Sequence, residues 1–168
     1  HRGGPSAIHD LAPITGALRC RKSPEELDVM RRAAHISTVG HLAAAETIRP
    51  GVPEYVVEAA INHAFRGAGA VGPAYESIVG AGVNATILHY VENADTIAAG
   101  DAVLVDAGAE YAWYAGDITR TYPASGRFSA EQRALYQIVL AAEIAAIDEV
   151  RLGRHFRSPH ERALEVLV

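Results

Sequence analysis

The stretch VLVDAGAEYAWYAGDITRTY, residues 103–122, decides which fold and which chemistry the sequence can support. Residues 102–105 form a short β-rich apolar run, and residues 111–114 and 118–122 continue the β character, so these segments are expected to be strands. Asp106 ends the first run, at a position where an apolar strand would normally exclude a charge. Asp117 follows eleven residues later in the second run. Any interpretation of the sequence must account for these two carboxylates.

The two runs are expected to form a hairpin that turns around residues 111–112. In that register, residues whose numbers add to 223 lie opposite each other, as Asp106 and Asp117 do. Their Cβ atoms would then be ~4.5–5.5 Å apart on one sheet face. Two such carboxylates repel each other unless a cation lies between them, and one or two divalent metal ions suit that position. The alternative is that each Asp only caps a strand end or a turn.

Helices are expected on both sides of these strands. Residues 23–26, SPEE, combine an N-cap serine, a proline at the first helical position and a glutamate that completes a capping box. This helix should run to about residue 48. Further helices are expected from about residue 53 to the Gly67–Gly69 break and from residue 129 to about residue 152. Another helix should begin at residue 158, where Ser158-Pro159-x-Glu161 repeats the capping chemistry. A further short strand is expected at residues 76–79. Helices followed by an antiparallel sheet and another helix predict an α+β fold.

The composition excludes several classes of protein. The chain has 168 residues, of which 49% are hydrophobic and 21% charged, and its formal charge is −5. This balance favours an ordinary globular protein with no nucleic-acid partner and no membrane surface. No apolar run approaches the ~20 residues that span a bilayer. Cys20 is the only cysteine, which excludes an intrachain disulfide and a cysteine-rich zinc site and is compatible with a cytoplasmic location.

Both ends of the chain indicate a piece of a longer protein. The chain starts with His1, and residues 1–17 are rich in glycine and proline, so they are expected to be a linker or the tail of an upstream domain. The helix starting at 158 reaches Val168 without a capping residue. Residues 18–168 are therefore expected to be a truncated domain.

The histidines offer one candidate for catalysis. His89 follows the apolar residues Ile87 and Leu88, and it is either a partly buried structural residue or a member of an active site. His35 and His41 are six residues apart on a predicted helix and share no face, so they form no metal-binding pair.

Three runs resemble a known family. PAYESIVG at 73–80, ILHYVEN at 87–93 and YAGDITRT at 114–121 are similar to the motifs of the Xaa-Pro aminopeptidase (aminopeptidase P) family. The spacings from His89 to Asp106 and from Asp106 to Asp117 also match those of that family. The resemblance extends from about residue 18 to about residue 150.

This resemblance implies a pita-bread fold, with the chain as the first half of the catalytic domain. It also implies a dinuclear metallopeptidase, most often with two Mn²⁺ ions, which removes the N-terminal residue of proline-containing peptides when proline is second. By motif position, Asp106 would bind one ion and Asp117 would bridge both. His89 would steady the scissile group or shuttle a proton. Thr119 would support the metal ligands, and Tyr75 would line the substrate pocket.

The family's remaining ligands, one histidine and two glutamates, lie in the half of the catalytic domain that this chain lacks. The isolated chain is therefore expected to bind manganese weakly and to have little peptidase activity. Half of the sheet would also expose an apolar face, so a second copy or a complementing chain is expected to cover it. Two alternatives are a non-catalytic peptide- or protein-binding relative and a metal-free creatinase-like enzyme. The presence of both aspartates argues against each of them.

Overall fold

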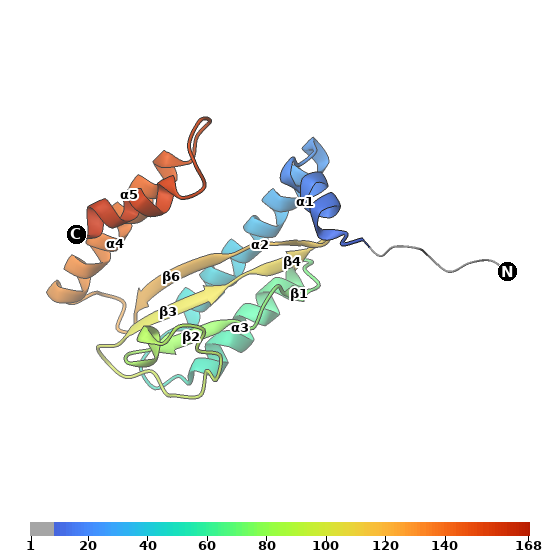
Figure 1. The fold of residues 1–168 in the computed structure, drawn as a ribbon. Helices are drawn as coiled ribbons and strands as arrows, with labels where there is room; N and C mark the ends of the chain where they lie inside the picture. The colour runs from blue at the N-terminus through green and yellow to red at the C-terminus, as the bar shows by residue number, and fades with distance from the viewer. Residues whose placement is uncertain (1–8) are drawn as a thin grey trace.

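A computed structural model of the chain describes residues 9–168. Residues 1–8, part of the predicted linker, lie outside the described residues. Three strands, β2 (Ile78–Ala81), β3 (Ala102–Ala107) and β6 (Ile118–Pro123), form the main antiparallel sheet in the order β2-β3-β6. The short strands β1 (Gly72–Pro73), β4 (Ala109–Tyr111) and β5 (Tyr114–Ala115) form a second sheet in the order β1-β4-β5. The helices of the described residues are α1 (Ala12–Cys20), α2 (Pro24–Thr47), α3 (Glu54–Gly67), α4 (Ala130–Glu149), α5 (Ser158–Leu167) and the 3₁₀ turn η1 (Asn84–Thr86). The predicted α+β organisation is confirmed (Figure 1).

The capping box at the start of α2 is present as predicted. The Ser23 hydroxyl accepts a hydrogen bond from the backbone N–H of Glu26, whose carboxylate accepts one from the backbone N–H of Ser23. At α5, the predicted start is right but the predicted cap is wrong. Arg157 is the N-cap residue and makes no side-chain cap, whereas Ser158 lies inside the helix and its hydroxyl accepts from the backbone N–H of His155.

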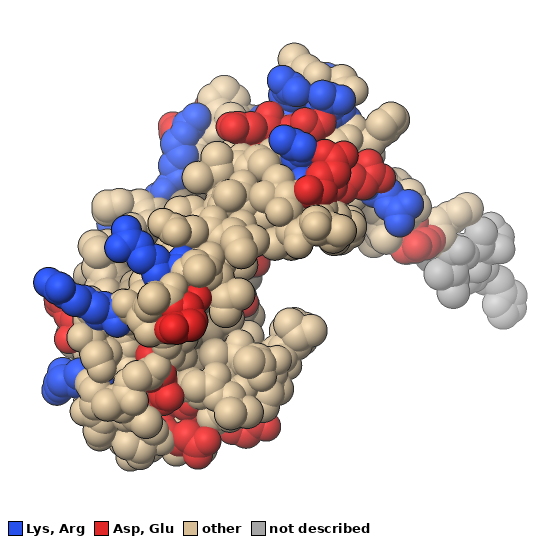
Figure 2. Space-filling model, turned by 90° about the vertical axis from the view of Figure 1, so that its left-hand side faces the viewer, with Lys and Arg blue, Asp and Glu red and all other residues tan. Residues whose placement is uncertain are grey.

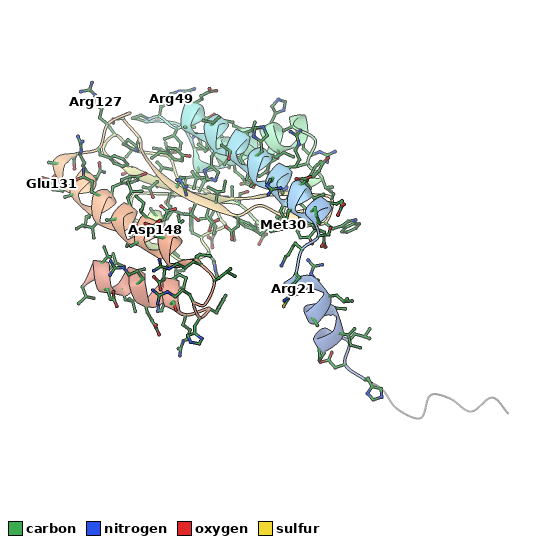
Figure 3. The ribbon with its side chains drawn as sticks, turned by 90° about the horizontal axis from the view of Figure 1, so that it is seen from above. Arg21, Met30, Arg49, Arg127, Glu131 and Asp148 are labelled. Atoms are coloured by element: carbon green, nitrogen blue, oxygen red, sulfur yellow. The ribbon has the colours of Figure 1, made fainter. Side chains whose placement is uncertain are left out.

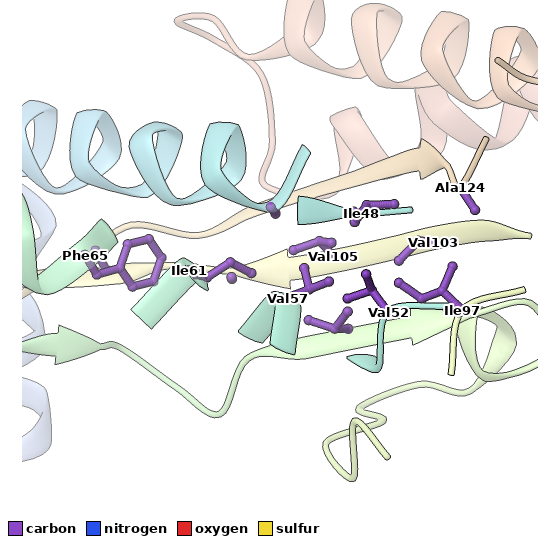
Figure 4. Close-up of a cluster of buried hydrophobic side chains, with 14 of the residues drawn as sticks. Ile48, Val52, Val57, Ile61, Phe65, Ile97, Val103, Val105 and Ala124 are labelled. Atoms are coloured by element: carbon purple, nitrogen blue, oxygen red, sulfur yellow. The ribbon is translucent and has the colours of Figure 1, made fainter. Parts of the chain in front are cut away.

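The core lies between one face of the main sheet and the helices α2 and α3. Along β3, Val103, Val105 and Ala107 are buried and the residues between them are partly exposed, which is the period-two pattern of a sheet covered on one side. Ile36 of α2 is fully buried in this core. Phe65 of α3 is also fully buried there (Figure 4). The other face, which carries Ala102, Leu104 and Asp106, stays open toward α4.

Strand β2 begins two residues later than predicted. The sequence suggested residues 76–79, whereas the strand runs from Ile78 to Ala81 and is buried throughout. The carbonyl of Ser77 accepts a hydrogen bond from the Asn93 side chain and is not used in the sheet. Residues 75 and 76 therefore lie before the sheet begins.

The hairpin register also differs from the prediction, by two residues. Asp106 lies opposite Thr119, and Tyr111 opposite Tyr114, so the turn falls at Ala112 and Trp113. Both turn residues have positive φ, 47° and 69°, which is the geometry of a tight hairpin turn that follows the strand twist. Sequence reasoning misplaced the turn because neither residue is a glycine or an asparagine. A shift of two residues preserves the sheet face, so Asp106 and Asp117 still share one face but are diagonal neighbours.

Helices α4 and α5 pack against each other on the open side of the sheet. Seen from above, the sheet lies between α2 and this helix pair (Figure 3). Many apolar side chains of the pair are exposed, including Leu135, Val139 and Ile147, and only Ala142 is buried on α4. These exposed apolar side chains belong to the helix pair and not to the sheet, so the predicted apolar sheet face and its covering by a second chain stay predictions.

Helix α1 spans the predicted boundary between residues 17 and 18 and has no buried residue. The boundary itself stays a prediction. Among residues 9–168, no helix combines the length and the apolar character needed to cross a bilayer.

We predict that Gly108→Ala destabilises the fold while Gly67→Ala does not. A Cβ at residue 108 would overlap the carbonyl oxygen of Gly116, which lies between β5 and β6, and backbone cannot move aside cheaply. We expect a loss of about 2–3 kcal/mol in the free energy of unfolding, as for other overpacked sites. Gly67 ends α3 with open space around it, so alanine there should be neutral or slightly stabilising. Urea unfolding followed by circular dichroism measures the stability of both variants. Equal unfolding midpoints for Gly108→Ala and Gly67→Ala would contradict the close approach of residue 108 to the Gly116 carbonyl.

Candidate metal centre

The two predicted carboxylates meet at the hydroxyl of Tyr75. The Tyr75 Oη atom lies 2.6 Å from Oδ1 of Asp106 and 3.0 Å from Oδ1 of Asp117. Asp106 is near the end of β3, Asp117 immediately precedes β6, and Tyr75 comes from the segment between β1 and β2. Three separate parts of the chain therefore converge on the open face of the sheet. The prediction that Asp106 and Asp117 lie close together on one face is confirmed.

Tyr75 contacts the carboxylates as well as lining the space beside them. Burial, together with the hydrogen bond to Asp106, raises the pKa of the Tyr75 hydroxyl well above its usual value. The hydroxyl therefore stays protonated, and its hydrogen is shared in hydrogen bonds to the two carboxylates. The sequence assigned Tyr75 only to the substrate pocket and gave no sign of this contact.

A hollow of about 360 Å³ opens next to the carboxylates. Tyr75, His89, Asp106 and Asp117 all line it, together with Glu76, Ile78 and Val91. The structure thus brings together four of the five side chains singled out in the sequence. His89 is exposed and has a positive φ of 55°.

Thr119 lies outside this hollow. It is opposite Asp106 in the strand ladder and faces a larger space of about 820 Å³ between the sheet and α4, which Asp117 also lines.

The two apolar residues before His89 are exposed, although an apolar run suggests burial. Ile87 and Leu88 are 50% and 90% exposed, so this apolar run is not part of the core.

The carboxylate pair suits a divalent cation but does not complete a site. Within residues 9–168, neither Asp106 nor Asp117 has an ion-pair partner, and no group of three or more His, Cys, Asp and Glu is placed to hold a metal ion. Carboxylate oxygens are the hard donors that Mn²⁺ and similar ions prefer. The two aspartates therefore fit as part of a metal site that needs further ligands.

His41, which sequence reasoning set aside, holds the two aspartate-bearing strands together. Its Nε2 atom is 3.2 Å from the carbonyl oxygen of Ala107 and 2.9 Å from that of Ile118, the residues that directly follow the two aspartates. Carbonyl oxygens only accept, so Nε2 carries the hydrogen. Nδ1 is then free to accept from the Tyr122 hydroxyl, 3.1 Å away. A lone histidine on a helix gives no sequence signal for such a role.

Other polar contacts from α2 hold the same hairpin. The Ser37 hydroxyl, itself buried, accepts from the backbone N–H of Ala109. Near the start of the helix, the Glu26 carboxylate accepts from the Tyr114 hydroxyl at 2.6 Å. Helix α2 therefore fixes the hairpin at three points along its length.

Comparison with known proteins identifies the class to which this fold and carboxylate pair belong. The chain belongs to metallopeptidase family M24, whose pattern matches residues 28–168. The match includes the whole main sheet and both aspartates.

Two relatives, both named Xaa-Pro aminopeptidase, show which kind of M24 peptidase the chain resembles. The chain is 43% identical to the Xaa-Pro aminopeptidase of Haemophilus influenzae over 161 residues, covering 96% of this chain and 37% of the relative. It is 49% identical to the Xaa-Pro aminopeptidase of Escherichia coli over 136 residues, covering 81% of this chain and 31% of the relative. The chain thus spans about a third of the length of these relatives.

Solved structures agree with the sequence comparison. The aminopeptidase PepP of Pseudomonas aeruginosa matches with a TM-score of 0.92 at 50% identity, covering 94% of this chain and 36% of that one. A variant of Escherichia coli aminopeptidase P in complex with substrate matches with a TM-score of 0.94 at 42% identity, covering 97% and 37%. A zinc-substituted form of that enzyme in complex with product also matches, at 0.93, 42% identity and the shares 96% and 37%. The predicted pita-bread fold is confirmed over the part that the chain covers.

We predict that His41 makes the stability of the fold depend on pH. Burial lowers the pKa of His41 below its ordinary value of 6.5, against the opposing effect of its carbonyl contacts. Just below pH 6.5 the unfolded chain therefore binds a proton that the folded chain does not. Above that pH, His41 therefore contributes its full share to the free energy of unfolding. This contribution is lost as the pH falls toward the lower pKa that His41 has in the folded chain.

Urea unfolding at pH 7.5 and pH 5.0 tests this expectation. His41→Gln should make the difference between the two pH values smaller, whereas the same change at the exposed His63 should leave it as in the parent chain. An unchanged difference in His41→Gln would show that other groups cause the pH dependence.

Proposed function

We propose that the complete protein containing this chain is a metal-dependent exopeptidase that removes the N-terminal residue from peptides with proline in the second position. The observation that carries the proposal is the pair Asp106 and Asp117, joined through Tyr75 on the open sheet face of an M24-family chain. The 43–49% identity to Xaa-Pro aminopeptidases supports the substrate class.

Asp106 would hold one of two divalent ions, most often Mn²⁺, and Asp117 would hold both. When bound, such ions lower the pKa of a water molecule and polarise the scissile carbonyl. Tyr75 would keep the two carboxylates in a fixed relative orientation by donating to their Oδ1 atoms. Thr119, opposite Asp106 in the strand ladder, would support the metal ligands.

His89 would act from the other side of the hollow. Its imidazole lines the same space as the carboxylates and is exposed, so a peptide could reach it. In this position it could donate a hydrogen bond to the scissile group or move a proton to the departing amine. Asp106 and Asp117 would hold the metal ions only together with the further ligands.

The surface of the chain carries charges of both signs. Acidic and basic side chains are interspersed on the face shown in Figure 2, whose outline is hollowed on one side. A neutral-to-acidic surface of this kind also accords with the proposal of no nucleic-acid or membrane partner. We further propose a cytoplasmic location, in keeping with the single exposed Cys20.

We predict that Asp106→Asn and Asp117→Asn each lower kcat/KM of the complete protein toward an Xaa-Pro peptide by at least ~100-fold, since even residues that merely support metal ligands contribute about 10–100-fold. Asp148→Asn is the matched control. It makes the same chemical change at an exposed position on α4 and should leave the activity unchanged. Release of the N-terminal residue in the presence of Mn²⁺ is the measurement.

The isolated chain is expected to show no turnover in the same assay, because the described residues supply only two of the carboxylates that a dinuclear site needs. Metal-dependent turnover by the chain alone would contradict this. Activity of the complete protein that survives both aspartate substitutions would contradict the proposed function itself.

A further inference from the structure

The loop that carries His89 is attached to the core through a buried carboxylate. Glu54, the first residue of α3, is fully buried, yet its side chain accepts four hydrogen bonds. Oε1 accepts from the backbone N–H of Ala81 at 2.7 Å and from the Asn84 amide at 3.2 Å. Oε2 accepts from the Tyr90 hydroxyl at 2.8 Å and from the backbone N–H of Asp95 at 3.0 Å. Three of the four donors belong to the segment from 84 to 95.

The formation of helix α3 does not require a buried carboxylate at its first residue. Burying a carboxylate is costly unless its oxygens are fully hydrogen-bonded, and in the described part of the chain Glu54 has no ion-pair partner. An exposed acid at the same helix start would serve the helix dipole equally well. The four bonds instead join α3 and the end of β2 to both ends of the His89 loop.

Tyr90 links this carboxylate to His89. Tyr90 is 8% exposed and points inward, and its hydroxyl also accepts from the Asn84 amide and from the backbone N–H of Ala94. His89 has a left-handed backbone, with φ of 55°. Tyr90 lies in the interior, whereas the preceding residue, His89, is exposed and lines the hollow with the aspartates.

A second buried side chain holds the far end of the loop. Asn93 is 2% exposed and also has a positive φ, 47°. Its Oδ1 accepts from the backbone N–H of Val79, and its amide donates to the Ser77 carbonyl and to Glu58. Left-handed conformations at such residues cost about 1 kcal/mol or more and persist where surrounding contacts enforce them.

We propose that Glu54 is a positioning residue for the reaction: acting through Tyr90, it fixes the loop so that the His89 imidazole faces Asp106 and Asp117. This inference rests on the proposed function only in the role given to His89. The placement of the loop itself is a structural statement that can be tested separately.

Glu54→Gln tests the proposal with almost no change in shape. All four partners of Glu54 are donors, and the glutamine amide would place a further donor against them. Glu46→Gln is the matched control, since Glu46 lies exposed on α2. Tyr90→Phe removes one of the four bonds and serves as the milder variant if Glu54→Gln does not fold.

The decisive readout is a double-mutant cycle in the complete protein. We expect Glu54→Gln to lower kcat/KM toward an Xaa-Pro peptide by ~10–100-fold, the range seen when supporting residues are removed. In a His89→Ala background, the same substitution should change kcat/KM by less than about twofold, because its effect passes through His89. An equal loss in both backgrounds would overturn the proposal and leave Glu54 a purely structural residue.

Amide hydrogen exchange separates this proposal from the proposed function. Glu54→Gln should speed exchange in residues 84–95 while leaving strands β3 and β6 unchanged, and Glu46→Gln should do neither. Unchanged exchange in the loop overturns the positioning role. If the parent protein shows no turnover, the proposed function fails, and the exchange result alone decides whether Glu54 fixes the loop.

Discussion

The antiparallel pairing of β3 with β6 is the constraint on which the candidate site depends. It places Asp106 opposite Thr119 and thereby brings Asp117 to the same sheet face. A register shifted by one residue would move one carboxylate into the apolar core. Two features keep the register: the tight turn at Ala112 and Trp113, and the close approach of Gly108 to the carbonyl of Gly116.

Polar side chains from the helices supplement this pairing where the apolar core cannot. The core packs only one face of the sheet, and it holds the strands without specifying where the loops lie. His41 bonds to the carbonyls that follow the two aspartates, and Glu54 bonds to both ends of the His89 loop. Each of these buried groups uses its hydrogen-bonding capacity on segments distant in sequence. Helix α2 thus positions the hairpin that carries the aspartates, and helix α3 positions the loop that carries His89.

The sequence predicted the parts of this arrangement that depend on local chemistry. Capping serines, apolar alternation and the carboxylate at Asp106 are local signals, and the helices α2 to α5, the strand β3 and the shared face of the aspartates followed from them, whereas helix α1 was not predicted. The turn was misplaced because Ala112 and Trp113 adopt positive φ without a residue that announces it. The roles of His41, Glu54 and the Tyr75 hydroxyl depend on contacts across 31 to 81 positions, which no local pattern contains.

A divalent cation is expected to bind at the open sheet face around Asp106 and Asp117. Titration of the isotope-labelled chain with Mn²⁺, followed by paramagnetic broadening of its amide resonances, tests this most directly, since broadening reports even weak binding. Resonances near Tyr75, Asp106 and Asp117 are expected to broaden first, and Asp106→Asn should abolish this pattern. Broadening that begins elsewhere, or that persists unchanged in Asp106→Asn, would contradict it.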